Sequence, residues 1–367
     1  MGTRIERRIS RHLPEEIIEE ILHSLPSKSL LRFKCVSKRW CSFISSKQFI
    51  KRHLKKSKID TDRTNRSLVS SFRRSPDIVG FMSLFRGPNT TLDPRYLQSL
   101  LDDDIIATLD SNHCCMGDST YDVRILGSCN GLVLMNIENY HYLFLWNPCT
   151  REIKKIRCTR PAFKKVYGLG YDEYADDYKV VCIFFSTRRT TSQTEVYSLK
   201  ADSWKKIEHF DKGSNYPPMC ESGKLVNGRL HWLMGHDDND LVIISLDLVE
   251  EKYEIVAGPK NTENICFGSV LNNLGGYLCL ITTSSVTGHQ SVWVMIEYGQ
   301  TESWTKIWTC SNSDDAMKMW PLPNDGIYNG KNVWCKYVWC ARLVYMVDAT
   351  TEPICYVESL VSPFGDK

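Results

Sequence analysis

Two acidic clusters are the first places where this sequence could perform chemistry. Asp102, Asp103 and Asp104 are consecutive, and four acidic residues fall within residues 172–177. Paired carboxylates can act as general acid and base, or can bind calcium. However, the second cluster lacks the central glycine and distal glutamate of an EF-hand loop, and acidic residues are common in turns. We therefore interpret both clusters as turns between strands.

Histidine and cysteine, the other usual catalytic and metal-binding residues, are dispersed. The nine histidines and fifteen cysteines form no C-x-x-C pair and no Cys/His set at zinc spacing. His231 lies in the strand-like stretch "LHW", where packing is the expected role, and Cys41 and Cys129 have no base that the sequence reveals. The sequence also lacks a G-x-S-x-G elbow, an H-E-x-x-H motif, a phosphate loop and a dinucleotide fingerprint. We predict no catalytic residue, no metal and no cofactor, and expect most cysteines to be reduced thiols within the core.

The distribution of charge divides the chain into two parts. The net charge of +3 combines a basic segment, residues 1–58, at +10 with a remainder at −7. Such a division is typical of two modules with different partners. The chain has no apolar run of about 18 residues that could cross a membrane, and its charged beginning does not resemble a secretory signal. We expect no membrane contact and a location in the cytoplasm, the nucleus or both.

The elements before residue 58 have the apolar spacing of short helices. Pro14 fits a first helical turn, Pro26 ends that helix, and Ser27 and Ser37 are expected to cap the next two. Apolar residues recur at steps of three and four in this segment: Ile17, Ile18, Ile21, Leu22, Leu25, Leu30, Leu31, Phe33 and Val36. A domain of about fifty residues buries little surface alone, so this pattern predicts contact with a partner protein. The lysines and arginines are scattered without a stacking or groove-reading motif, so we do not expect a nucleic acid partner.

The motifs of this segment resemble those of the F-box. The resemblance covers about residues 10–52 and rests on Leu13-Pro14, Ile17, Ile21-Leu22, Leu25-Pro26, Leu30, Cys35-Val36 and Lys38-Arg39-Trp40. It implies docking onto a Skp-type adaptor, which links an F-box to a cullin and a RING subunit in an SCF-type ubiquitin ligase. The adaptor-binding residues that it implies are Leu13, Pro14, Ile17, Ile21, Leu22, Leu25, Pro26, Leu30, Val36 and Trp40.

From about residue 60 the pattern changes to short β-strands that repeat. Each unit has an apolar strand, a polar turn and a strand that opens on a bulky residue. These bulky residues are Ile153, Trp204, Tyr253, Trp304 and Ile354, at separations of 51, 49, 51 and 50 residues. A β-strand period near 50 predicts a propeller of four-stranded blades, with about six blades here. A β-sandwich with accidental periodicity is the alternative.

The repeated region also resembles a known domain. "GSCNGLVLM", "LWNPCTREIKKI", "GLGYDEYADDYKVV" and "EVYSLKADSW" are similar to the F-box-associated domain of plant F-box proteins. The period resembles that of kelch repeats, but only Gly275-Gly276 provides the kelch glycine pair. We expect an all-α F-box domain (residues 1–58), a linker (59–66), an all-β propeller (67–360) and a C-terminal tail (361–367).

These resemblances imply a non-catalytic substrate receptor, whose propeller recruits an unknown target protein for ubiquitination. Loops on a rigid scaffold commonly carry binding residues, with aromatic residues and arginines as anchors. The candidates for target binding are Arg188, Arg189, Tyr216, His236 and Trp320. Two alternatives stay open: an F-box scaffold that does not act through a cullin ligase, and a propeller enzyme.

Overall fold

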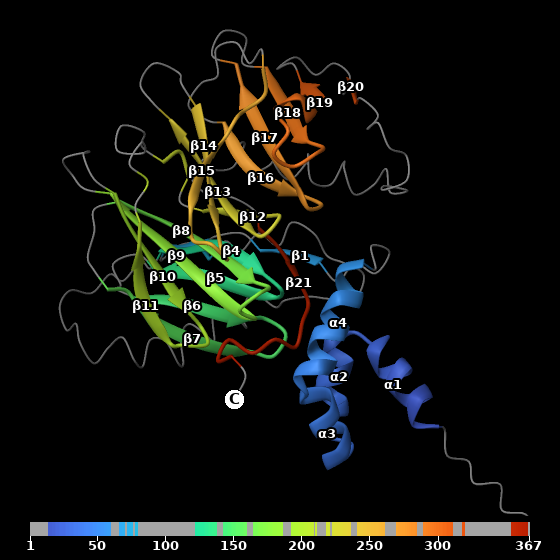
Figure 1. Ribbon diagram of the computed structural model, residues 1–367. Coiled ribbons are helices and arrows are strands. Elements are labelled where there is room, and N and C mark those ends of the chain that lie inside the picture. Colours follow the sequence, from blue (N-terminus) through green and yellow to red (C-terminus); the bar gives the residue numbers. More distant parts are fainter. Residues whose placement is uncertain are drawn as a thin grey trace, which may run out of the picture.

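The computed structural model has a small helical module followed by a β-propeller (Figure 1). The described residues are 14–59, 66–69, 72–75, 78–79, 122–137, 142–159, 164–185, 192–208, 210, 218–220, 222–235, 241–260, 269–284, 289–310, 318–319 and 354–365. The predicted linker falls mostly on residues 60–65, and Asp102–Asp104 fall in residues 80–121, so both lie outside this part of the chain. The predicted order of an α-helical module and a β-propeller is confirmed.

Four helices form the N-terminal module: α1 (Glu15–His23), α2 (Ser27–Phe33), α3 (Lys38–Ser45) and α4 (Lys47–Ile59). Proline precedes both of the first two helices, because Pro14 and Pro26 occupy their N-cap positions. Ser27 is therefore the first residue of α2 rather than its cap, so that expectation was wrong. Ser37 caps α3 as predicted, since its side chain accepts a hydrogen bond from the Trp40 backbone N–H at 3.1 Å.

The strands form successive antiparallel sheets, which we number as blades in chain order. Blade 1 contains β4 (Asp122–Cys129), β5 (Leu132–Ile137), β6 (Tyr142–Asn147) and β7 (Glu152–Arg157), extended by β2 (Phe72–Ser75) and β3 (Ile78–Val79). Blade 2 contains β8 (Lys164–Asp172), β9 (Asp177–Phe185), β10 (Ser192–Ser198) and β11 (Ser203–Ile207). Blade 3 contains β12 (Lys224–Val226), β13 (Arg229–Gly235), β14 (Leu241–Asp247) and β15 (Tyr253–Val256). Blade 4 contains β16 (Val270–Leu274), β17 (Tyr277–Thr283), β18 (Gln290–Met295), β19 (Trp304–Cys310) and β20 (Lys318–Met319), with the short 3₁₀ helix η3 (Thr301–Ser303) before β19.

Four of the five bulky residues found by the sequence repeat occupy equivalent positions in these blades, whereas Ile354 lies in a separate two-stranded sheet. Each of the four lies in the strand after a hairpin turn and pairs with the strand before it: Trp146 with Ile153, Tyr197 with Trp204, Leu246 with Tyr253, and Met295 with Trp304. Two of them also join neighbouring blades through the indole. Trp204 Nε1 donates to the Arg157 carbonyl and Trp304 Nε1 donates to the Ala257 carbonyl, both at 2.9 Å. The repeat therefore marks the outer strand of a blade and its contact with the preceding blade.

The blades are arranged side by side through their first strands, as in a propeller. Strand β8 lies beside both β4 and β12, and β12 lies beside β16. The described residues contain four blade sheets and a separate two-stranded sheet, against the expected number of about six blades. In that fifth sheet β1 (Arg66–Val69) pairs with β21 (Ile354–Val357), which also lies beside β4 (Figure 1). The first and last strands of the described propeller thus pair with each other.

The helical module rests on this ring through α4. Asp176, in the turn between β8 and β9, forms ion pairs with Lys47 at 2.6 Å and Lys51 at 2.5 Å. Leu54 of α4 belongs to the apolar core of blades 1 and 2, and Ile50 packs against it. Residues 361–365, expected to form a tail, begin in the same core, because Val361 is buried there. The helices and the propeller therefore share a packed boundary.

Candidate functional site

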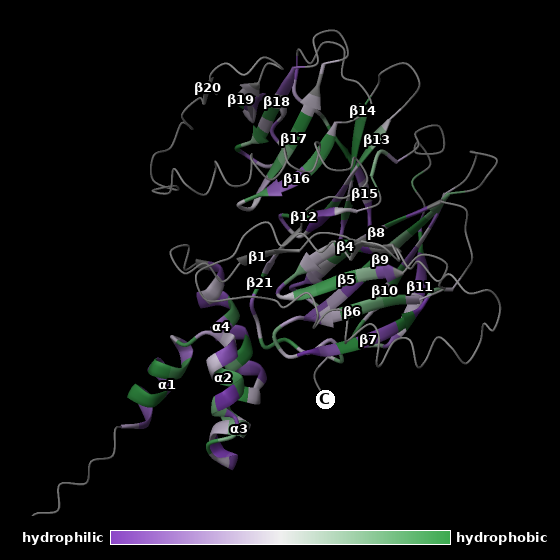
Figure 2. Ribbon diagram, turned by 180° about the vertical axis from the view of Figure 1, so that it is seen from behind, coloured by the Kyte–Doolittle hydropathy of each residue, from purple (hydrophilic) through white to green (hydrophobic). Residues whose placement is uncertain are grey.

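Three large apolar side chains of the helical module are exposed to solvent, two on α1 and one in the turn between α2 and α3. Ile17 and Ile21 are 44% and 47% exposed, and Val36 is 61% exposed. Ile17 and Ile21 are four residues apart on α1 and therefore share one face of that helix. In both ribbon views α1 lies on the side of the module away from the sheets, and Figure 2 shows its apolar residues. We call Ile17, Ile21 and Val36 the exposed apolar surface.

The structure divides the remaining residues of the predicted adaptor face into three groups. Pro14 and Pro26 are exposed, and Leu25 and Trp40 are half-buried. Leu22 and Leu30 are buried in the helical core, with exposed fractions of 1% and 0%. They therefore support the surface from inside and do not form part of it, because their helices turn these side chains toward Ile44 and Phe49. Leu13 lies outside the described residues.

Contacts between the helices fix the shape of this surface. His53 of α4 bonds through Nε2 to the Leu25 carbonyl at 2.8 Å, and Lys56 donates to the Ser24 hydroxyl at 2.7 Å. Arg39 of α3 forms an ion pair with Glu15 of α1. These bonds join α1 to both α3 and α4, so the exposed apolar surface is carried on a connected set of helices.

Buried histidines lie beneath the surface. The ring of His23 stacks on Phe49 at a centroid distance of 4.2 Å. Burial, followed by electrostatic repulsion from Arg52, His53 and Lys56, lowers the pKa of His23 to about 4. Burial also lowers the pKa of His53, against the opposing effect of its bond to Leu25. Both histidines are therefore neutral at pH 7 and act as packing residues.

The charges around the exposed apolar surface are segregated. On α1 the carboxylates of Glu15, Glu16, Glu19 and Glu20 are all on exposed residues. The exposed residues of α2, α3 and α4 carry positive charges instead, at Lys28, Arg32, Lys38, Arg39, Lys51, Arg52, Lys55, Lys56 and Lys58. A partner bound at Ile17 and Ile21 would contact acidic residues on α1 and basic residues on the other helices. Such a pattern orients a partner more than it adds to affinity.

The five residues predicted to bind a target all lie outside the described part of the chain. Arg188 and Arg189 lie between β9 and β10, Tyr216 before β12, His236 between β13 and β14, and Trp320 after β20. The structure therefore brings none of them together, and their role stays a prediction.

The described strands do show where two of these segments leave the blades. Strand β9 runs from the turn that holds Asp176 to residue 185, and β13 runs from its equivalent turn at 227–228 to residue 235. The first strands of blades 2 and 3 run in the same direction, since Tyr167 of β8 and Ser222 just before β12 form a parallel bridge. The second strands, β9 and β13, are antiparallel to them and therefore also run in the same direction. Strands β9 and β13 therefore end, at Phe185 and Gly235, on the side of the blades opposite to the one that contacts α4.

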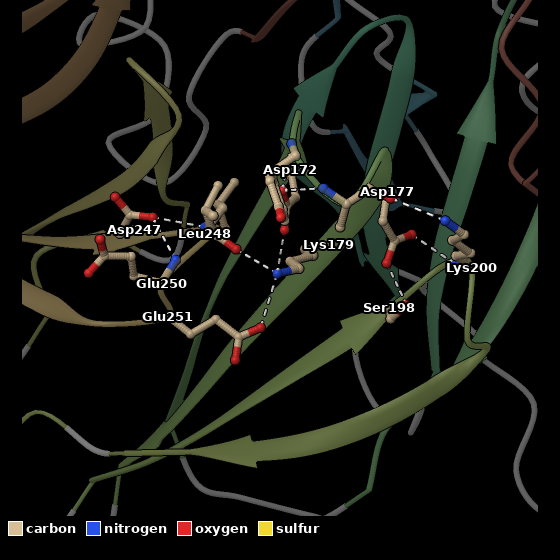
Figure 3. Close-up of polar contacts among 12 residues, drawn as sticks. Asp172, Asp177, Lys179, Ser198, Lys200, Asp247, Leu248, Glu250 and Glu251 are labelled. Carbon is tan, nitrogen blue, oxygen red and sulfur yellow. Dashed lines mark hydrogen bonds and ion pairs between the residues drawn. The ribbon is translucent and has the colours of Figure 1, made fainter.

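The acidic cluster around Asp172 is a structural feature that joins two blades (Figure 3). Asp172 accepts hydrogen bonds from the Tyr174 and Ala175 backbone N–H groups at 3.0 and 2.9 Å, as expected for a turn. Its carboxylate also pairs with the buried Lys179 at 2.8 Å, and Lys179 pairs with Glu251 of blade 3 at 3.0 Å. The carboxyl groups are thus engaged by turn amides and a lysine, and the interpretation of this cluster as a turn is confirmed.

Two of the other residues considered for catalysis, His231 and Cys129, are buried in the blades. His231 is fully buried, with Nδ1 3.1 Å from the Lys224 carbonyl and Nε2 2.8 Å from the Tyr298 hydroxyl. Burial lowers its pKa to about 4, and burial raises the pKa of the Cys129 thiol to about 12. Cys41 is exposed. Within the described ranges, no group of three or more His, Cys, Asp or Glu side chains could hold a metal ion.

A helical module with an exposed apolar surface, fixed to a β-propeller, is the architecture of an F-box receptor protein. Comparison with known proteins agrees: residues 11–52 match the F-box domain and residues 100–362 match the F-box associated beta propeller domain. The chain belongs to the family of F-box proteins that carry this propeller.

Similar proteins come from Arabidopsis thaliana. F-box/kelch-repeat protein At3g23880 is 30% identical over 315 residues, which cover 84% of this chain and 82% of that protein. F-box protein CPR1 is 28% identical over 331 residues, which cover 81% of this chain and 72% of that protein. Among solved structures, AofleA from Arthrobotrys oligospora has a TM-score of 0.33 at 13% identity, covering 53% of this chain and 61% of that one.

None of the helices in the described ranges is long and apolar enough to cross a membrane.

Proposed function

We propose that this protein is the substrate-recognition subunit of an SCF-type ubiquitin ligase. In this proposal the helical module binds a Skp-type adaptor, which connects it to a cullin and a RING subunit. The observation that carries the proposal is the exposed apolar surface, since Ile17, Ile21 and Val36 are large side chains that the chain itself does not cover. The chain places this surface within the region that matches the F-box domain.

The proposed receptor acts by proximity and performs no bond chemistry itself. Its propeller holds a target protein, through residues such as Arg188, Arg189, Tyr216, His236 and Trp320, while the adaptor holds the rest of the ligase. Holding two reactants together raises their effective concentration, which is the contribution of a non-catalytic receptor. The packed boundary at Asp176 and Leu54 supports this role, because it holds the helices and the propeller together.

A binding experiment with matched surface variants tests adaptor recognition. We expect Ile17→Asp with Ile21→Asp to weaken binding to a purified Skp adaptor by at least about a hundredfold, because two buried isoleucines contribute about 1.5–3 kcal/mol each. The control is Val249→Asp with Ile255→Asp, since these propeller residues are 50% and 49% exposed. The control should bind the adaptor like the unaltered protein in calorimetry. Full binding by the α1 variant would overturn the proposed adaptor surface.

Reconstituted ubiquitination separates a ligase subunit from an F-box scaffold that does not act through a cullin. Targets would first be captured with the full chain and identified by mass spectrometry. A captured target should then gain ubiquitin when adaptor, cullin, RING subunit and this protein are combined. A target that binds but is not modified in the complete system would favour the scaffold.

A further inference from the structure

The C-terminal strand brings its following residues to the helical module. Strand β21 pairs antiparallel with β1, so that Val357 at the end of β21 lies opposite Arg66 at the start of β1. Since β1 is the first strand after α4, the chain leaves β21 close to the point where it left the helices (Figure 1). The segment Glu358–Val361 is consequently placed between the helices and blade 1.

Alternate residues of this segment face the two sides. Ser359 faces blade 1, where its hydroxyl donates to the Asn130 carbonyl at 2.7 Å. Val361 belongs to the apolar core shared by blades 1 and 2, whereas Leu360, between them, belongs to the helical core. This alternation is what an extended segment produces when both of its faces are covered.

Blade 1 fixes the backbone of the segment. The Asn147 side-chain amide donates to the Ser359 and Val361 carbonyls, at 3.2 and 2.6 Å. Gly131 lies against the segment with φ of +89°, and a Cβ there would clash with the Ser359 side chain. Leu360 is therefore held in position by the sheet, independently of the helices that it contacts.

Leu360 fills the centre of the helical module. It is 3% exposed, and its cluster otherwise contains Leu22, Leu30, Ile44 and Phe49, which come from all four helices. Leu22 immediately follows the exposed Ile21 on α1, so the core that Leu360 completes lies directly beneath the exposed apolar surface. A small module has few buried side chains, and each one is a large share of its core.

We propose that Glu358–Val361 is a structural part of the adaptor-binding module, and that Leu360 acts as the positioning residue that keeps α1 and α2 in the binding conformation. The pairing of β21 with β1, which joins the first and last described strands, then also completes the helical core. Adaptor binding is thereby coupled to the pairing of these two strands. The part of this inference that concerns binding rests on the function proposed above.

The test compares two adjacent residues in the full chain. Leu360→Ala opens a cavity in the helical core, whereas Val361→Ala opens one in the sheet core. Without adaptor, we expect Leu360→Ala to speed amide hydrogen exchange in residues 15–33 by at least about tenfold and to leave the strands of blade 1 nearly unchanged. Val361→Ala should do the reverse. Unchanged exchange in residues 15–33 of Leu360→Ala would overturn the inference.

Adaptor affinity is measured on the same two variants. Leu360→Ala should weaken adaptor binding by at least about tenfold, while Val361→Ala should bind within about threefold of the unaltered protein. Equal affinity of all three proteins would overturn the coupling. If the unaltered protein binds no adaptor, the proposed function fails, and the exchange comparison still decides whether Leu360 holds the helices.

A milder variant covers the case in which Leu360→Ala does not fold. Leu360→Val removes less volume and should loosen residues 15–33 in the same selective way, and Leu360→Met, which conserves volume, should restore protection. Selective loosening with rescue by methionine supports the inference. Equal loosening of the helices and blade 1 by valine overturns it.

Discussion

The helices and the blades differ in how much of their apolar surface the chain itself covers. In blade 1, the consecutive residues Leu143–Trp146 of β6 are all at most 2% exposed. In the helices, Ile21 is 47% exposed while its neighbour Leu22 is 1% exposed. The inner strands of the blades bury both faces, whereas the outer strands and the helices leave one face partly exposed. The inner strands are thus covered by the chain itself, and the exposed apolar face of α1 is available to a partner in the function proposed above.

The first prediction compares one tryptophan from each region. Trp232 of blade 3 is fully buried and donates from Nε1 to the Tyr167 carbonyl of blade 2 at 3.0 Å. We expect Trp232→Ala to lower the free energy of unfolding by about 3–5 kcal/mol, because it leaves a large cavity and removes one of the hydrogen bonds that the Tyr167 carbonyl accepts. Trp40 is half-buried, so Trp40→Ala should lower it by about 1–2 kcal/mol.

Denaturant unfolding of both variants, followed by circular dichroism, provides the measurement. A cost for Trp232→Ala no larger than that for Trp40→Ala would contradict the view that the blades contain the more completely buried core.

The second prediction compares a buried lysine with an exposed lysine at the contact between blades 2 and 3. The side chains of Lys179 and Lys205 both pair with Glu251, but they are 10% and 63% exposed. Lys179→Ala would leave the buried Asp172 without its positively charged partner, with only two backbone N–H bonds to its carboxylate, and should cost about 3 kcal/mol. Lys205→Ala removes an exposed pair and should cost less than about 1 kcal/mol. Urea titration of the two variants checks this, and similar midpoints would show that the contact between blades 2 and 3 does not depend on Lys179.

The third prediction concerns pH. We expect a change of pH to alter the stability of the helices more than that of the outer strands of the blades. His23 and His53 have pKa values below the usual 6.5, because burial disfavours their charged forms. Below pH 6.5 the unfolded state therefore binds more protons than the folded state. Stability should be constant above about pH 6.5 and then fall by at most about 1.4 kcal/mol per pH unit for each histidine as the pH approaches 4.

One buried carboxyl group opposes this trend. Burial raises the pKa of Glu358, so this residue binds its proton more readily in the folded state and offsets part of the loss at low pH. Hydrogen exchange of residues 15–33 between pH 7.5 and 4.5, corrected for the intrinsic rate, measures the net effect. In His23→Leu the pH dependence should weaken, and a slope equal to that of the unaltered protein would exclude His23 as its source.

Local patterns in the sequence predicted the elements, and the structure explains where they fell short. The spacing of Trp204 and Trp304 placed two outer strands correctly, because each repeat contains its own turn and its own anchor. The helical period identified Leu22 and Leu30 as apolar positions, and the F-box resemblance implied that they belong to the adaptor-binding face, whereas the structure buries both in the helical core. Periodicity defines a stripe on a helix, and only the packing of the other helices decides which part of that stripe is covered.

Contacts between distant segments were missed for a related reason. Nothing near Leu360 in the sequence indicates that it belongs with α1 and α2, since the pairing of β21 with β1 determines its position. The link from Lys179 to Glu251 likewise depends on the register of two blades. One signal could have indicated such a contact. It is an apolar residue directly after the last strand, where that strand pairs with the first strand.

The position of Leu360 also has a consequence for biosynthesis. The helices are translated early, but the side chain that fills their centre is translated roughly 300 residues later, which takes about 15–60 s at 5–20 residues per second. During that interval the cluster of Leu22, Leu30, Ile44 and Phe49 lacks the Leu360 side chain that completes it. The helices are thus translated well before their core can be completed, and we expect a chain truncated before Leu360 to be destabilised at the helices.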